Sequence, residues 1–404
     1  MKDHHKLIGL SEQRIGWISE HALVNLKGIR KDAKAADPAI LKLLAEAEKS
    51  LQARTFTVMD KKVLPPSNSK HDYMSLSIYN WPNPDTADGL PYVTRDGHVN
   101  PEVEDYDRPS MAEMAYVVEV LLLSYAVMGE LRYAHKAIKL LAAWFIDPST
   151  RMNPNMLYAQ YIPGNGGFDR PERYPAVYVP GVEGRGVYVA FGGVIEGVRL
   201  VPIVNLLPLL DDCPLWTDEL ALGIREWFRD FLYWLLEHQH GKDEASCLNN
   251  HGSWYCTQVV TYALFTGERE IALQYLQHQV PERMEMQIQA DGSLPEELGR
   301  ANSFHYVVYA LTSFFNLALL GEQVGIKLWH HNGIRQSIDW LIPYLVNPST
   351  WPYKLAETME QQLIGAVPLL TMAYKAYEDP MYARVLKQLL PYPEDHRYRL
   401  LFTI

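Results

Sequence analysis

Apolar residues recur every three to four positions through most of the chain, which is the spacing of one face of an α-helix. Capping and turn residues such as Asp37-Pro38 and Gly129-Glu130 mark where helices begin and end. No segment shows the convincing alternation of a β-strand. The pattern predicts helices over residues 18–33, 38–52, 111–128, 132–146, 186–210, 220–238, 253–266, 268–289 with a break at Pro281, 304–320, 334–346, 361–377 and 380–390.

Two long segments, residues 63–109 and 147–184, lack this pattern and are dense in Pro, Gly, Asn and Asp. Irregular segments of such length inside a compact domain are usually lids or cleft walls. We therefore expect one domain over residues 1–404, built as an all-α (α/α) toroid, an incomplete barrel of helical hairpins whose long loops wall a cleft. A tetratricopeptide-like array is less consistent with the chain, because no period of 34 residues is sustained.

The composition fits a large folded core, with 48% hydrophobic residues, 10 Trp and 25 Tyr. Aromatic rings can stack on sugars in carbohydrate clefts, but they also fill ordinary cores. Both interpretations stay open for the aromatic residues of the first irregular segment, which are Tyr73, Tyr79, Trp81 and Tyr92.

A net charge of -11 argues against a nucleic-acid partner, although a basic cleft can sit on an acidic body. No run of 18 apolar residues predicts a membrane span, and no signal peptide is visible, although one could have been removed. Three cysteines without a CxxC pair predict neither a disulfide framework nor a zinc site. His238, His240, His330 and His331 lack the spacing that puts two ligands on one helical face, so we expect no metal and no cofactor.

The candidate chemistry lies between residues 247 and 306, where Asn250, His251, Arg300 and Tyr306 occur next to predicted helix starts. A uronic acid loses its C5 proton only if its carboxylate is neutralised, and Asn and Arg side chains can donate hydrogen bonds to that carboxylate. Tyr or His can then move protons. Each residue also has an ordinary structural interpretation: an N-cap for Asn250, a buried histidine, a salt-bridged arginine and a core tyrosine.

Several motifs resemble the alginate lyase superfamily of polysaccharide lyases, in the order in which that family carries them. The most specific is the N-terminal block KHDYMSL, YNWPNP, GLPYVTRDG and NPE, between residues 70 and 102. NPN and YAQ between residues 153 and 160, NNH at 249–251 and RANSFHY at 300–306 follow. The resemblance covers roughly residues 65 to 320.

The resemblance implies a toroid that performs metal-independent β-elimination. Asn250 and Arg300 would neutralise the carboxylate, Tyr306 would be the acid and for some substrates the base, and His251 would be a second base or a carboxylate partner. The spacing from Arg300 to the tyrosine is one residue shorter than the family pattern, so the role of Tyr306 could fall to His305 or Tyr309. We assign substrate contact to Tyr79, Trp81, Gln160, Arg185, Trp254 and His305.

The substrate implied is an acidic polysaccharide, either alginate, mannuronate-rich in particular, or glucuronan, and the implied location is periplasmic or secreted. Two other classes stay open. A glycoside hydrolase would need paired carboxylates, with Asp72, Asp105, Glu296 and Glu297 as candidates. A non-catalytic helical-repeat scaffold would need none of this chemistry. The sequence does not predict the oligomeric state.

Overall fold

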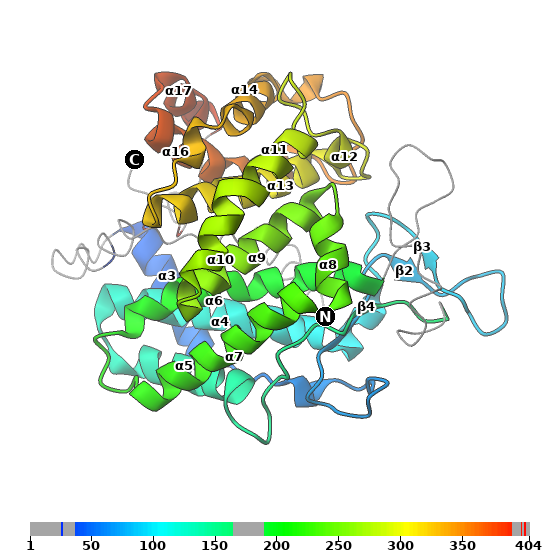
Figure 1. The fold of residues 1–404 in the computed structure, drawn as a ribbon, viewed down its shortest axis with the longest axis vertical. Coiled ribbons are helices and arrows are strands. Elements are labelled where there is room, and N and C mark those ends of the chain that lie inside the picture. The colour runs from blue at the N-terminus through cyan, green and yellow to red at the C-terminus, as the bar shows by residue number, and fades with distance from the viewer. Residues whose placement is uncertain (1–25, 27–36, 165–189, 390–396, 398–399, 401–404) are drawn as a thin grey trace.

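The computed structural model describes residues 26, 37–164, 190–389, 397 and 400 (Figure 1). Helices dominate this part of the chain, and they form the predicted all-α, incomplete toroid rather than a closed barrel. The α-helices are α3 (Pro38–Leu51), α4 (Asp107–Met128), α5 (Leu131–Phe145), α6 (Val201–Leu206), α7 (Asp218–Glu237), α8 (Gln239–Ser246), α9 (Asn250–Thr266), α10 (Arg269–Gln274), α11 (Val280–Gln287), α12 (Pro295–Leu298), α13 (Ser303–Gln323), α14 (Asn332–Val346), α15 (Met359–Leu363), α16 (Ala366–Tyr377) and α17 (Pro380–Gln388). Shorter turns include the 3₁₀ segments η4 (Ala190–Leu200) and η5 (Leu207–Leu210) and the π-helical η6 (Tyr275–Gln279).

Helix α9 lies in the middle of the molecule and packs against both α13 and α7 (Figure 1). It is buried on nearly every side, from Asn250 to Ala263, which is why its apolar pattern has no polar face. It ends at Gly267, whose φ of 86° is the left-handed conformation that glycine adopts without strain. Since α9 is held on all sides, its first turn is a rigid platform for side chains.

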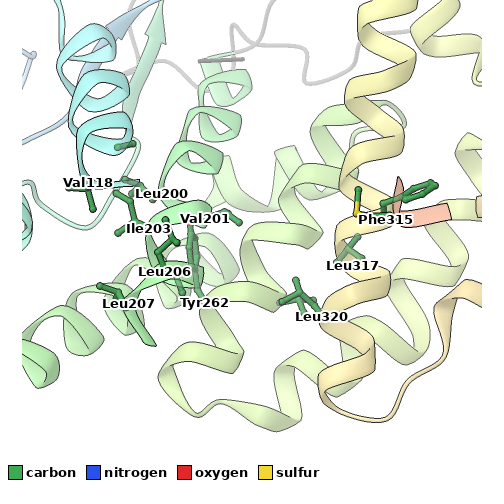
Figure 2. Close-up of a cluster of buried hydrophobic side chains, with 14 of the residues drawn as sticks. Val118, Leu200, Val201, Ile203, Leu206, Leu207, Tyr262, Phe315, Leu317 and Leu320 are labelled. Carbon is green, nitrogen blue, oxygen red and sulfur yellow. The ribbon is translucent and has the colours of Figure 1, made fainter. Parts of the chain in front are cut away.

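One continuous core of buried side chains extends from α3 to α17. Figure 2 shows part of it, with Val118 of α4, Val201 of α6, Tyr262 of α9 and Phe315 of α13. Three helical stretches, Asp107–Met128, Gly193–Leu210 and Ser303–Gln323, are long and apolar enough to cross a membrane by length and composition. In each, 78% of the apolar window is buried inside the protein, so the core itself accounts for their hydropathy.

Four short strands were missed by the sequence analysis. Strand β1 (Met74–Leu76) pairs in parallel with β4 (Tyr158–Tyr161), and β2 (Asn80–Trp81) pairs antiparallel with β3 (Val93–Thr94). Strands of two to four residues are too short for an alternating pattern to appear in sequence. Their consequence is structural: the β1–β4 pair joins the two irregular segments to each other.

Several predicted helix boundaries were wrong. Residues 269–287 form one continuous helical run, and the π-helical turn η6 precedes Pro281 where a break was expected. A widened turn accommodates a residue that lacks a backbone N–H. The predicted helix 361–377 is instead divided into α15 and α16, and the predicted helix 18–33 lies outside the described residues except for Leu26.

The predicted helix 186–210 is, where the structure describes it, largely a 3₁₀ segment that packs closely on its neighbours. A Cβ atom at Gly193 would come within 2.2 Å of the Ala159 carbonyl oxygen, and one at Gly197 within 2.2 Å of Gln258 Oε1. Glycine therefore lets η4 approach both β4 and α9, which brings η4 into the wall of the cavity described below.

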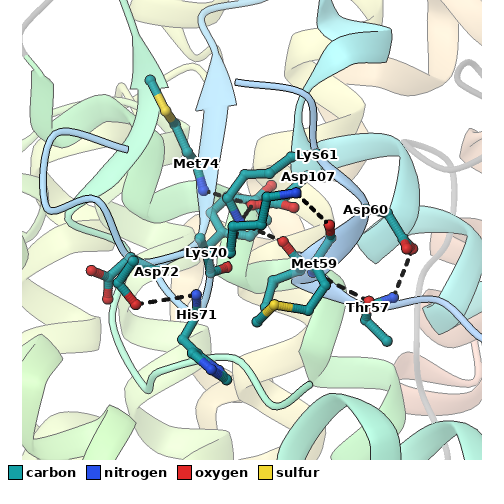
Figure 3. A network of polar contacts seen from close by, with 12 residues as sticks. Thr57, Met59, Asp60, Lys61, Lys70, His71, Asp72, Met74 and Asp107 are labelled. Carbon is teal, nitrogen blue, oxygen red and sulfur yellow. Dashed lines mark hydrogen bonds and ion pairs between the residues drawn. The ribbon is translucent and has the colours of Figure 1, made fainter. Parts of the chain in front are cut away.

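A buried ion pair fixes the start of α4 to Lys61, which lies just before the first irregular segment (Figure 3). Lys61 Nζ lies 2.7 Å from Asp107 Oδ2 and also donates to the carbonyl oxygens of Val58 and Lys70, each at 2.6 Å. Asp107 in turn accepts from the backbone N–H of Met74 in β1. All three donors of the ammonium group are thus used, which offsets the cost of burying it.

Candidate active site

A cavity opens between the first irregular segment, α4, η4, α9 and α13. It contains eight of the ten residues assigned from sequence: Tyr79, Gln160, Asn250, His251, Trp254, Arg300, His305 and Tyr306. Arg108, Glu119, Glu196, Arg199, Tyr309 and Asn316 also line it. The residues from the two ends of the 247–306 stretch therefore do face one cavity, together with partners that are far away in sequence.

Trp81 is not among the cavity's lining residues. Its indole N–H donates to the His98 carbonyl oxygen over 2.8 Å, and the Arg95 guanidinium lies 5.3 Å from its ring centre. Through these contacts Trp81 anchors the first irregular segment. Arg185 lies outside the described residues, and Tyr73, with no exposed surface, donates its hydroxyl hydrogen to Glu196 inside the protein.

Asn250 occupies the first turn of α9, which begins three residues earlier than predicted. The N-cap is Asn249, whose side chain accepts from the His251 backbone N–H over 3.1 Å, so the capping interpretation of Asn250 was wrong. Asn250 instead donates its backbone N–H and its side-chain amide to the two oxygens of Glu297, over 2.6 and 2.8 Å. A carboxylate only accepts hydrogen bonds, so this contact fixes which way the Asn250 amide points.

Glu297 itself is almost fully buried. Burial raises the pKa of its carboxyl group to about 7, although the Arg300 charge and the two bonds from Asn250 act in the opposite direction. It lies on α12, three residues before Arg300. Glu297 therefore links the Asn250 amide on α9 to the turn that carries Arg300.

His251 is held in a similar way by a buried carboxylate. Its Nδ1 atom lies 2.8 Å from Oε1 of Glu244, which has no exposed surface. Since the carboxylate can only accept, the hydrogen resides on Nδ1, and the neutral imidazole then has Nε2 as its acceptor atom. This is the tautomer that a general base requires.

Arg300 and Tyr306 form the closest pair of candidate groups. Arg300 Nη2 donates to the Tyr306 hydroxyl over 2.8 Å, and its central carbon lies 3.8 Å from the tyrosine ring centre. The Tyr79 hydroxyl lies 3.1 Å from the same oxygen, and either hydroxyl can be the donor. The positive charge of Arg300 beside the phenolic oxygen favours its anionic form, and the Tyr79 hydroxyl adds to this when it is the donor.

Asp96, from the first irregular segment, positions Arg300. Its carboxylate accepts from Arg300 Nη2 over 2.9 Å and from the Ala301 backbone N–H over 3.2 Å. Burial acts to raise the pKa of Asp96, but the hydrogen bond and charge of Arg300 outweigh it, and the pKa is lowered. The ionised aspartate thus holds the guanidinium against Tyr306.

The other two candidates for the role of Tyr306 belong to an aromatic stack. The His305 ring lies parallel to the Tyr309 ring, with centres 6.0 Å apart, and Trp254 lies 4.9 Å from Tyr309. The Tyr306 hydroxyl is the one that accepts the bond from Arg300. This geometry favours Tyr306 for proton transfer and gives the stack a surface suited to a sugar ring.

Gln160 ends up on the cavity because the backbone bends there. Its φ is 52°, a conformation that is uncommon for residues other than glycine, and its N–H donates to Ser75 Oγ of β1 over 2.7 Å. The β1–β4 pair therefore places Gln160 on the cavity that Tyr79 also lines.

The carboxylates proposed for a hydrolase are not paired across this cavity. None of the four candidates, Asp72, Asp105, Glu296 and Glu297, is among the residues that line it. Asp72 accepts from Asn153, Asp105 pairs with exposed Lys62, and Glu297 accepts from Asn250. Among the described residues, no group of three or more His, Cys, Asp or Glu side chains is arranged to hold a metal ion.

The family model for alginate lyase matches residues 57–351, which is more than half of the chain. The chain belongs to the alginate lyase family. Its structure is similar to the crystal structure of an alginate lyase from Bacteroides ovatus, with 29% sequence identity over 95% of this chain and 98% of that one and a TM-score of 0.86. A histidine-to-alanine variant of alginate lyase A1-III, an enzyme of Sphingomonas species A1, shares the fold at 15% identity, over 87% of this chain and 86% of that one, with a TM-score of 0.53. No curated protein matches the chain.

This alginate lyase family member is thus a polysaccharide lyase. Nothing in the sequence pointed to Glu244, and Asp96 had no predicted role although it lies in the motif GLPYVTRDG. Asp96 follows Arg95 and precedes Gly97 in a turn, and only the fold brings it to Arg300. Glu244 lies seven residues before His251, on a different helix, so helical spacing gave no signal.

Proposed function

We propose that this member of the alginate lyase family cleaves alginate, mannuronate-rich alginate in particular, or the related polymer glucuronan, by metal-independent β-elimination. The observation that carries the proposal is the contact of Arg300 with the Tyr306 hydroxyl on a cavity that also contains Asn250. A donor for the substrate carboxylate and a group that can move protons are therefore neighbours, as this reaction requires.

The first task is to make the C5 proton acidic. The remaining N–H of the Asn250 amide and the guanidinium of Arg300 would donate to the sugar carboxylate and stabilise the enediolate formed as the proton leaves. Glu297 and Asp96 hold these two donors in place before the substrate arrives. Preorganised donors of this kind lose little free energy to reorganisation during the reaction.

Tyr306 would then move the hydrogen. As a phenolate stabilised by Arg300, it takes the C5 proton, and the electron pair of that bond forms the C4–C5 double bond. The bond from C4 to the glycosidic oxygen breaks, and the departing oxygen takes the proton from the Tyr306 hydroxyl. The products are a new chain end and a 4,5-unsaturated uronate, with no water consumed.

The stereochemistry of the sugar decides whether Tyr306 suffices. In β-D-mannuronate and β-D-glucuronate the C5 hydrogen and O4 lie on the same face, so one tyrosine can serve both steps. In α-L-guluronate they lie on opposite faces, and His251, with Nε2 as acceptor, would be the base. An acidic polysaccharide outside the cytoplasm would be the partner, in keeping with the periplasmic or secreted location expected from the family.

The test is a panel of mannuronate-rich alginate, guluronate-rich alginate, glucuronan and pectate, each followed by the ultraviolet absorbance of the unsaturated product. We expect the largest rate on mannuronate-rich alginate or glucuronan, and the same rate after treatment with a chelator. Absence of ultraviolet-absorbing product from all four polymers would refute the proposal. A new reducing end without the absorbance would indicate hydrolysis instead.

A further inference from the structure

Helix α11 packs against α9, and no residue of this helix, which the structure describes throughout, lines the cavity. It carries a buried arginine, Arg283, which is only 7% exposed. Burying a guanidinium is costly unless its N–H groups find acceptors. Here Nη1 donates to the Cys247 carbonyl oxygen over 2.5 Å, and Nη2 donates to the Ala245 carbonyl oxygen. The arginine of α11 is therefore bound to the backbone of another part of the chain.

Both acceptors belong to the end of α8. Ala245 lies in its last turn, and Cys247 is its C-cap residue. The last carbonyl oxygens of a helix have no donor within the helix and carry a partial negative charge, so a cation that donates to them is favourable there. Arg283 thus closes the C-terminal end of α8, directly beside Glu244.

The same helix also holds the beginning of α9. A Cβ atom at Gly252 would come within 2.0 Å of Arg283 Nη1, so only glycine leaves room for the guanidinium under this turn. Gln287, one turn further along the same face of α11, donates to the Asn249 carbonyl oxygen over 2.7 Å. The two side chains therefore fix the corner between α8 and α9.

This corner carries the candidate base and the carboxylate that orients it. Ala245 directly follows Glu244, and Gly252 directly follows His251. The 2.8 Å contact between His251 Nδ1 and Glu244 Oε1 joins the two helices, so it depends on how α8 meets α9. A catalytic group that is misplaced by about 1 Å can cost about 100-fold in rate.

We propose that Arg283 is a positioning residue for proton transfer. By holding the corner between α8 and α9, it keeps Glu244 against Nδ1 of His251, and Nε2 thereby stays without hydrogen and ready to accept a proton. Without Arg283, the imidazole would exchange between its two neutral forms, and the form with hydrogen on Nε2 cannot act as a base. This inference rests on the proposed role of His251 in elimination on guluronate.

The direct test is the ¹⁵N NMR spectrum of the His251 ring, assigned with the His251→Ala variant and recorded at a pH high enough to keep the imidazole neutral. In the wild type the hydrogen should reside on Nδ1. In Arg283→Met the Nε2 signal should move toward that of a nitrogen that carries hydrogen. An unchanged spectrum in the folded variant would overturn the proposal. This measurement needs no substrate, so it decides the role of Arg283 even if the protein proves not to cleave guluronate.

The kinetic test is the ratio of the rates on guluronate-rich and mannuronate-rich alginate. Arg283→Met should lower this ratio at least about fivefold, because only elimination on guluronate needs His251 as base. Added to Glu244→Gln, it should lower the ratio no further, since residues that act through one contact are not additive. Additive losses would mean that Arg283 does not act through Glu244, and would overturn the proposal. Absence of unsaturated product from the wild type would instead refute the lyase function.

Arg229→Met is the matched control. The Arg229 guanidinium donates to the Thr266 carbonyl oxygen at the other end of α9, over 3.4 Å, so it makes the same kind of contact with a helix end. Its rate ratio and its His251 spectrum should equal those of the wild type. The same changes in this control as in Arg283→Met would indicate a general loosening of α9 and overturn the proposal.

Arg283→Lys covers the case in which Arg283→Met does not fold. The lysine keeps the positive charge, but a single ammonium group cannot reproduce the two-pronged contact of the guanidinium. Its rate ratio should lie below that of the wild type, and its Nε2 signal should move in the same direction as in Arg283→Met. Wild-type values for both would overturn the proposal.

Discussion

The Arg300 guanidinium lies against both parts of the Tyr306 side chain, 2.8 Å from Nη2 to the hydroxyl oxygen and 3.8 Å from its central carbon to the ring centre. Both residues come from a segment of seven positions between α12 and the first turn of α13. The pair is held from outside by Asp96 and Tyr79. The cation that would neutralise a substrate carboxylate is thus the same group that favours the phenolate.

The Tyr306→Phe substitution should reduce kcat by about 10²- to 10⁴-fold, because it removes the hydroxyl that moves protons. The free energy of unfolding should change by no more than about 1 kcal/mol, since the ring remains. Steady-state ultraviolet assays and urea unfolding measure both quantities. Tyr309→Phe and His305→Ala are the controls for the alternative assignments. A normal kcat for Tyr306→Phe together with a collapse in either control would move the role to that residue.

Glu244→Gln should separate the two modes of elimination. The glutamine can still accept from Nδ1 of His251, but its amide can also turn and present a donor, so the tautomer is no longer fixed. We expect activity on guluronate-rich alginate to fall at least about tenfold and activity on mannuronate-rich alginate to change little. The ratio of the two rates is the measurement. Equal losses on both polymers would mean that His251 does not act as a base specific for guluronate.

Glu297 predicts a pH dependence with a definite sign. Its pKa in the folded protein is raised by burial to about 7, so this group's contribution to stability is present at low pH and declines as the pH rises through 7. The hydrogen bonds from Asn250 require the ionised carboxylate of Glu297, so they are lost as the pH falls through 7. We therefore expect kcat to fall on the acid side with a midpoint near 7, under conditions where the protein is fully folded.

The Glu297→Gln substitution checks this assignment. The variant has no proton to gain at this position, so its lower activity should not show the acid-side decrease that Glu297 causes. His251→Ala serves as the comparison, because it removes the neighbouring imidazole and leaves Glu297 in place. A decrease that disappears only in His251→Ala would assign the midpoint to the imidazole.

Removing one partner of the buried Lys61–Asp107 pair should lower the stability of the folded protein strongly. Burial raises the pKa of Asp107 to about 7 and lowers that of Lys61 even though each charge stabilises the other, so either charge left alone would be more costly still. Asp107→Asn should therefore reduce the free energy of unfolding by about 3–5 kcal/mol, as measured in urea. The double variant Lys61→Met, Asp107→Leu should recover only part of that loss, because the Met74 N–H and the carbonyl oxygens of Val58 and Lys70 lose their partners. A single variant with unchanged stability would show that the pair is not what holds the start of α4 in place.

The helical fold was predictable because amphipathic spacing survives in almost every outer helix, for example in α5 and α7. The boundaries of α9 were not predictable, because a helix buried on all sides has no polar face to mark its limits. Asn249, four positions before the predicted start at Ser253, was the overlooked capping signal. Strands β1 and β4 escaped detection because they are short and pair across a wide gap in sequence, from Met74 to Tyr158, whereas β2 and β3 have only two residues each.

For the site, the sequence predicted the groups that resemble a known chemistry but not the residues that hold them. Asn250, His251, Arg300 and Tyr306 lie in two short motifs, and the structure brings those motifs to one cavity. Glu244 and Asp96 act through contacts that only the folded chain creates. Their residue types are ordinary at the positions where they occur, and nothing in local spacing distinguishes them from surface carboxylates.

The contact between Asp96 and Arg300 spans 204 positions, and it has a consequence for engineering. Exchanging the first irregular segment for that of a relative, in order to alter polymer preference, would also exchange the anchor of the guanidinium. A chimera whose donor loop lacks an acidic residue at this point should fold and still be nearly inactive. Restoring one aspartate should revive it.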